Sequence, residues 1–181
     1  MATPSRQEAL ATLADGQAQL DQLLARLSEP QMTQPATIGG GDWSAKDLLG
    51  HIATWEALAL RTIREWLRNE IPWVEQDEGV FSAPAAGKVD AFNARMVAEK
   101  AGKTLADVRA EAARVHRDLM IAIDSLPDAE WSKNASYRTP NGRRRKLATL
   151  VGSVLGAPQR PFGHAFAHLP DLEAYVGDVA G

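Results

Sequence analysis

The chain has 181 residues, of which 45% are hydrophobic and 24% are charged, and this composition is typical of one globular domain spanning residues 1–181. It contains no cysteine, which excludes disulfides, thiolate nucleophiles and cysteine-type zinc sites. The net charge of −3 argues against a nucleic-acid-binding protein. No apolar run reaches the roughly 18 residues of a membrane span, and the first ten residues lack a secretory pattern, so a cytoplasmic location is expected.

The N-terminal part of the chain predicts two long amphipathic helices. Ser5 and Glu8 form a capping box ahead of leucines that recur at three- and four-residue steps, and Pro30 is expected to end this first helix. A second box, Ser44 with Asp47, opens a helix that Pro72 bounds. The apolar stripe of this second helix comprises Leu48, Ile52, Trp55, Ala59, Ile63 and Trp66. Its polar face is expected to carry Arg61, Arg64, Glu65 and Arg68.

Residues 71–87 show no helical periodicity. A connection of this length inside a compact domain is usually functional or disordered. Trp73 and Phe81 need an apolar surface to pack on, so we expect this segment to cover a functional site. A short helix is predicted for the residues that follow, 88–101.

The C-terminal part predicts two further helical regions. One extends over residues 104–126, and the last begins near residue 146. The sequence GAPQRP at 156–161 should interrupt the last region, because Pro158 and Pro161 do not fit a helix interior.

Pro170 is expected to kink the resumed helix near Phe166, or to start a new helix there. The chain therefore predicts an all-α protein, a four-helix bundle with a long crossover connection between its second and third long helices.

Three of the four histidines form a candidate metal site. His164 and His168 are four residues apart, so on a helix they share a face. His51 lies on the second helix, beside its apolar stripe. Taken singly, a buried histidine is more often a hydrogen-bonded core residue, and an exposed pair at this spacing also arises by accident. Together, three imidazoles on facing helices would leave one coordination position open, as in catalytic rather than structural metal sites. We expect their ring nitrogens to converge at one end of the bundle.

Other polar residues have weaker assignments. His116 borders the stripe of the third helix and is expected to be a hydrogen-bonded flank residue. Glu56 is expected to be a surface charge pointing away from His51. Asp47 is either a member of the capping box or a hydrogen-bond partner of the His51 ring. The aromatic residues that could approach the site are Trp55, Trp73 and Tyr137.

Two stretches of the sequence resemble a known family. WSAKDLLGHIATWE (43–56), followed downstream by HxxxH (164–168), resembles the DinB-like superfamily. The segment from Asp90 to Trp131 is similar to the ClbS/DfsB branch of that superfamily. The resemblance extends over roughly residues 5–176 and implies a bundle with an unusual connection order. It also implies a divalent metal, nickel or zinc, held by His51, His164 and His168.

The resemblance further implies an enzyme that acts on a small reactive or thiol-linked molecule, of transferase or hydrolase type, with a role in detoxification or self-protection. Activities in the superfamily include thiol-cofactor-dependent transfer and isomerisation, and the opening of a reactive cyclopropane. Two alternatives stay open: a bundle that sequesters a small molecule without turnover, and a dimeric scaffold with a vestigial site. A homodimer is a further expectation.

Overall fold

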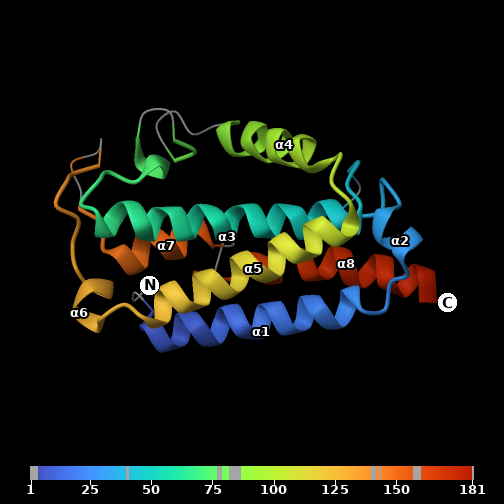
Figure 1. Ribbon diagram of the computed structural model, residues 1–181, viewed down its shortest axis with the longest axis horizontal. Helices are drawn as coiled ribbons and strands as arrows, with labels where there is room; N and C mark the ends of the chain where they lie inside the picture. The colour runs from blue at the N-terminus through green and yellow to red at the C-terminus, as the bar shows by residue number, and fades with distance from the viewer. Residues whose placement is uncertain are drawn as a thin grey trace.

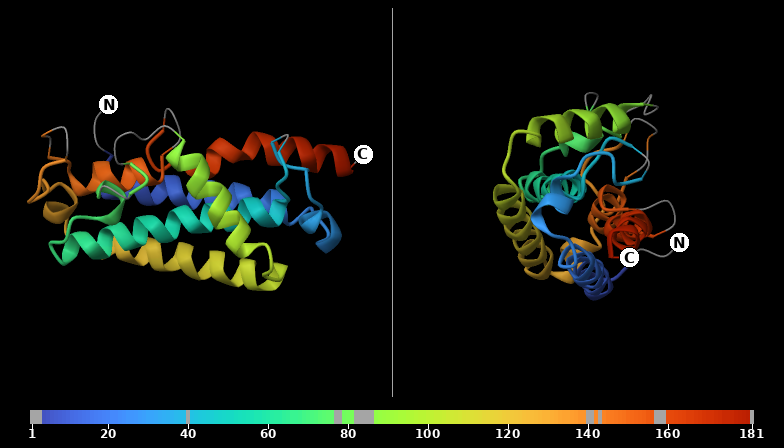
Figure 2. Two further views of the ribbon diagram at one scale, coloured as in Figure 1. Left: turned by 90° about the horizontal axis from the view of Figure 1, so that it is seen from above. Right: turned by 90° about the vertical axis from the view of Figure 1, so that its right-hand side faces the viewer.

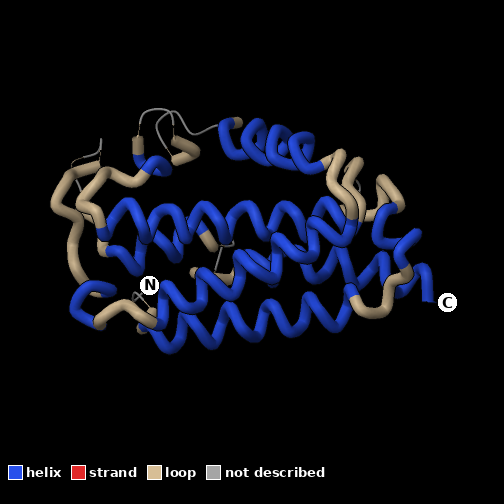
Figure 3. Tube along the Cα trace, in the orientation of Figure 1, coloured by secondary structure: helices blue, strands red, loops and turns tan. Residues whose placement is uncertain are grey.

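The computed structural model describes residues 4–39, 41–76, 79–81, 87–139, 142, 144–156 and 160–180. These residues form an all-α structure without a sheet, as Figure 3 shows. The elements are α1 (Arg6–Leu24), α2 (Glu29–Thr33), α3 (Ala45–Leu67), η1 (Trp73–Glu75), α4 (Lys88–Lys100), α5 (Leu105–Asp124), α6 (Asp128–Trp131), α7 (Leu147–Val154) and α8 (His164–Ala180). None of these helices is both long and apolar enough to cross a lipid bilayer.

Helix α3 runs through the centre of the bundle, and other helices pack against it on several sides (Figure 1). Its neighbours are α2, η1, α4, α5, α7 and α8, and 17 of its 23 residues are buried. Helices α7 and α8 follow one another along the bundle and together take the place of a fourth long helix (Figure 2). Helix α4 lies outside the bundle, within the long connection from α3 to α5. The predicted four-helix bundle with a crossover is therefore confirmed.

The capping residues begin the long helices as predicted. The Ser5 and Ser44 hydroxyls accept hydrogen bonds from the backbone N–H groups of Glu8 and Asp47, and both boxes are complete. The prediction for Pro30 is wrong, because α1 already ends at Leu24. Pro30 is instead the second residue of α2, where a missing backbone N–H costs nothing.

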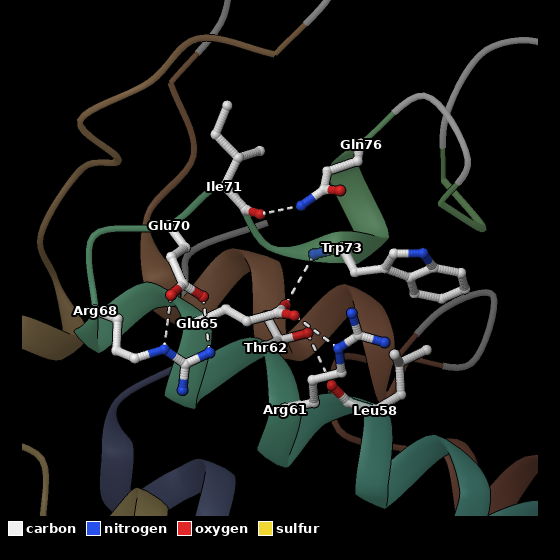
Figure 4. A network of polar contacts seen from close by, with 9 residues as sticks. All are labelled: Leu58, Arg61, Thr62, Glu65, Arg68, Glu70, Ile71, Trp73 and Gln76. Carbon is white, nitrogen blue, oxygen red and sulfur yellow. Dashed lines mark hydrogen bonds and ion pairs between the residues drawn. The ribbon is translucent and has the colours of Figure 1, made fainter.

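The first part of the α3–α4 connection is tied to α3 by a buried carboxylate (Figure 4). Glu65 Oε2 accepts from the Trp73 backbone N–H at 2.8 Å, and Glu65 Oε1 pairs with Arg61 Nε at 2.6 Å. Glu65 was expected on a polar face, but it is 7% exposed. The reason is that the connection folds back over this end of α3 and covers the carboxylate.

Buried side chains form two apolar clusters along the bundle. The first contains Trp55 and Leu155, together with Phe162. The second contains Leu48 and Leu172, with residues of α1, α2, α3, α5 and α8. His51 lies where these two clusters meet, because, of its neighbours on α3, Trp55 belongs to the first cluster and Ile52 to the second.

Candidate metal centre

His51, His164 and His168 converge, although α3 and α8 are far apart in sequence. His164 Nε2 lies 3.1 Å from His51 Nε2 and 3.3 Å from His168 Nε2. One ligand atom from each ring lies within 4.8 Å of the other two. The expected convergence is confirmed, but its expected position at an end of the bundle is wrong. The site lies between the two apolar clusters, because α8 begins at His164, well inside the bundle.

The donor set and its spacing fit a divalent cation. Tetrahedral ligands with metal–nitrogen bonds of about 2.0–2.1 Å lie about 3.3 Å apart, close to the two measured separations. A neutral imidazole carries one N–H, so His164 Nε2 can satisfy only one of its two neighbours through its own proton. If all three nitrogens instead directed their lone pairs at one ion, no proton would be needed between the rings. The proton of His164 would then lie on Nδ1, which is buried and has no hydrogen-bond partner among the described residues.

The surroundings of the three rings keep them neutral. Burial, with smaller contributions from His168 and Lys100, lowers the pKa of His51 to about 3. Burial, with smaller effects of the other two rings, lowers the pKa of His164 well below its ordinary value. Burial also lowers the pKa of His168, although Asp171 opposes the shift. Neutral imidazole is the form that binds metal.

The start of α8 is fixed by the turn that follows α7. The His164 backbone N–H donates to the Leu155 carbonyl oxygen at 2.9 Å. Phe162 adopts a left-handed backbone with φ of 61°, which costs energy for a residue other than glycine. The Phe162 ring is 2% exposed and stacks on Trp131, so its burial offsets that cost. The predicted interruption of the last helical region is confirmed, because α7 ends at Val154 and α8 begins at His164. Residues 157–159, including Pro158, lie outside the described residues.

One of the two expectations for Pro170 was that it starts a new helix, and this expectation is wrong. Helix α8 continues through Pro170, the seventh residue of the helix. His164 and His168 therefore share the first turns of one helix, with ring centroids 5.0 Å apart. Their face is the one predicted from the four-residue spacing.

A pocket of about 240 Å³ opens beside the histidines. Its apolar walls include Trp55, Phe81, Val89 and Val154. Phe81 belongs to the 71–87 segment, so the expectation that this segment covers the site is supported at this residue. Among the described residues that line the pocket, none is an Asp, Glu, Lys or Arg. Residues 77–78 and 82–86 lie outside the description.

Helix α4 forms the outer wall of the pocket and is attached to α3 at two places. Asn93 Oδ1 accepts from Trp55 Nε1 at 3.0 Å, and the Phe92 ring meets the Trp55 ring edge-on at 5.5 Å. At the other end of α4, Lys100 Nζ donates to the Gly50 carbonyl oxygen at 2.8 Å. The α4 wall is thus held by contacts on both sides of His51.

The prediction that Glu56 is a surface charge is wrong. Glu56 is 6% exposed, and its Oε1 lies 2.9 Å from His116 Nδ1. Its carboxylate is paired with a residue of α5, which covers that side of α3. His116 is a hydrogen-bonded flank residue, as expected. Asp47 serves the capping box: its Oδ2 accepts from the Ser44 backbone N–H and hydroxyl, and no bond joins Asp47 to His51.

The aromatic candidates divide between the site and other places. Trp55 lines the pocket as expected, whereas Trp73 lines a separate groove with α4. Tyr137 does not reach the site; its hydroxyl donates to Glu75 Oε2 at 2.5 Å. Sequence reasoning missed Trp43, whose ring centroid lies 4.8 Å from that of His51. It also missed Asn93, because an amide on a short surface helix carries no pattern that signals a site.

Fold and site together define a helical bundle with a three-histidine cluster, in which His51 is buried and the other two histidines are half-buried. Residues 12–156 match the family model of the DinB superfamily, and the chain belongs to that superfamily. The matched segment includes His51 and ends before His164. No curated protein matches the chain.

Solved structures with the same fold are distant in sequence. The crystal structure of an uncharacterised protein from Escherichia coli UTI89 has a TM-score of 0.74 at 12% identity, covering 97% of this chain and 95% of that chain. A mycothiol-dependent maleylpyruvate isomerase has a TM-score of 0.61 at 18% identity. The match covers 95% of this chain and 63% of the isomerase, so this chain spans less than two thirds of that protein.

Proposed function

We propose that His51, His164 and His168 bind one divalent cation, nickel or zinc, and that the protein is a metal-dependent enzyme acting on a small molecule. The observation that carries this proposal is the approach of three Nε2 atoms to one another beside an apolar pocket. Three protein ligands leave a coordination position for water or a substrate atom, which is the arrangement of catalytic sites.

The substrate class is a further part of the proposal. The isomerase that shares the fold is mycothiol-dependent, and the central segment resembles the ClbS/DfsB branch. We therefore propose a reactive or thiol-linked substrate and a reaction of transferase or hydrolase type. Because this chain has no cysteine, any thiol must come from the substrate or a cofactor.

The bound cation would act as a Lewis acid or lower the pKa of a water or thiol in the open position. The chain's own residues supply the surroundings for that chemistry. Trp55 and Phe81 give one side of the pocket an apolar surface. Trp43 packs against the His51 ring and limits its rotation. Because no described lining residue is an Asp, Glu, Lys or Arg, the cation would supply the charge that a substrate meets in the pocket.

The test is a calorimetric titration of zinc and nickel into protein purified without a histidine tag and stripped with chelator. At pH 8 the wild type should bind about one equivalent, and His51→Ala should lose tight binding with unchanged circular dichroism. His116→Ala is the matched control, since His116 is a half-buried histidine outside the cluster, and it should bind like the wild type.

Equal metal binding by wild type and His51→Ala would contradict the site. Metal binding without turnover of any thiol adduct or electrophile would instead favour the sequestering alternative.

A further inference from the structure

The pocket contains a polar group that the three histidines do not use. Asn93 lies on α4 and lines the pocket together with His51, His164 and His168. Its Oδ1 accepts a hydrogen bond from Trp55 Nε1 at 3.0 Å. Ser153 also lines the pocket, but its hydroxyl proton is already donated to the Thr149 carbonyl oxygen at 2.8 Å.

The indole partner determines which way the Asn93 amide faces. An indole N–H can only donate, so the amide oxygen, and not the amide nitrogen, must face Trp55. Nδ2 then keeps two N–H donors, and no described residue accepts a hydrogen bond from them. A donor held in a fixed orientation at the edge of an otherwise apolar pocket is complementary to an acceptor atom on a bound molecule.

Trp55 links this donor to the metal ligands. It lies four residues after His51, so both side chains project from the same face of α3. The Trp55 ring also approaches the His164 ring, with centroids 5.8 Å apart. Trp55 therefore fixes the Asn93 amide relative to two of the three histidines.

We propose that Asn93 Nδ2 donates a hydrogen bond to an oxygen atom of the small molecule bound beside the metal, and that Trp55 is the positioning residue for this donor. The site accordingly selects ligands in which a carbonyl-type oxygen lies next to the metal-binding atom. This inference depends on the proposed metal centre.

The experiment compares the binding of two metal-binding probes to cobalt-loaded protein. Binding is monitored through the visible absorption spectrum of the cobalt. 2-Mercaptoacetamide carries a carbonyl oxygen next to its metal-binding sulfur, whereas ethanethiol binds through the same atom and has no oxygen. Asn93→Ala should weaken mercaptoacetamide binding by about fivefold to tenfold, the effect of one lost hydrogen bond, and leave ethanethiol binding unchanged. Trp55→Phe should weaken mercaptoacetamide binding in the same selective way. Glu99→Ala, an exposed change on the same helix, should affect neither probe.

A second measurement works without metal. The indole N–H resonance of Trp55, assigned by its loss in Trp55→Phe, should shift and exchange faster with solvent in Asn93→Ala. Equal loss of both probes, or no loss of either, would overturn the role of Asn93 while metal binding stands. Failure of the wild type to bind cobalt would overturn the metal centre, and this inference with it.

Discussion

The backbone N–H of His164 donates to the carbonyl oxygen of Leu155, so the first residue of α8 is bonded directly to the residue that follows α7. This bond makes the interruption between the two helices part of the site. It sets where α8 begins, and hence where the two histidines of its first turns lie relative to His51.

Gly163 precedes His164 in a turn without room for a side chain. A Cβ atom at Gly163 would lie 2.9 Å from the Arg160 carbonyl oxygen and side chain. Gly163→Ala should therefore destabilise the protein by about 1–3 kcal/mol and weaken zinc binding, because the start of α8 must shift. Thermal unfolding and zinc calorimetry measure the two effects.

Gly177 provides the matched control within the same helix. Nothing lies within 4 Å of a Cβ at this position. Gly177→Ala should stabilise α8 by about 0.5–1 kcal/mol and leave zinc binding unchanged. A Gly163→Ala protein that binds zinc as the wild type does would show that the turn does not set the ligand geometry.

Acid should destabilise the metal-free protein through His51. Burial, and then the charges of His168 and Lys100, lower its pKa to about 3, against about 6.5 in the unfolded chain. Between these two values the unfolded state binds a proton that the folded state does not. The contribution of His51 to the free energy of unfolding is therefore complete above pH 6.5 and is lost as the pH falls towards 3. Between pH 8 and pH 5.5 the loss from His51 should be about 1.4 kcal/mol. Urea unfolding in chelator should show a smaller loss in His51→Ala; equal losses would exclude a neutral buried His51.

The His116–Glu56 pair should have the opposite pH dependence. Burial acts to lower the pKa of His116, but the hydrogen bond and charge of Glu56 outweigh burial and raise it. The stabilising effect is thus complete below pH 6.5 and is lost as the pH rises through the raised pKa. Glu56→Gln should lower the free energy of unfolding by about 1–3 kcal/mol at pH 6, and by less at pH 8.5. An effect that grows with pH would contradict a protonated His116.

Glu65 should hold the α3–α4 connection in place. Its carboxylate is buried and accepts from the Trp73 backbone N–H. Glu65→Ala leaves that donor without its partner, so we expect about 1–3 kcal/mol of destabilisation and faster proteolysis within residues 71–87. Glu70→Ala, which removes an exposed ion pair with Arg68, is the control and should leave both measurements unchanged. Similar effects of the two changes would argue against Glu65 as the anchor.

Helical periodicity was sufficient to predict which faces of the helices carry the three clustered histidines. His164 and His168 share a face because of their four-residue spacing, and His51 borders an apolar stripe, so each ring could be placed on its own helix. The hydrophobic periodicity of one helix does not indicate how many other helices pack against it. Helix α3 is covered on several sides, and for this reason Glu56 and Glu65, which looked like surface charges, are buried.

The contacts between helices were harder to foresee. The Asn93–Trp55 hydrogen bond depends on how α4 lies across α3, which the sequence of neither helix specifies. The position of the site also depends on a three-dimensional turn: Phe162 is held in a left-handed conformation by its buried ring, and so α8 begins inside the bundle. Pro30 was also ambiguous in the sequence. A proline is common both in the first turn of a helix and just after the end of a helix, and Pro30 lies in the first turn of α2.

The three imidazoles form a polar layer between two separate apolar clusters, each with its own buried side chains from α3. Packing on either side of the layer does not involve the three imidazoles. The scaffold thereby separates the requirements of folding from those of binding. Substitution of the three histidines should then leave the outer layers, and with them the bundle, in place.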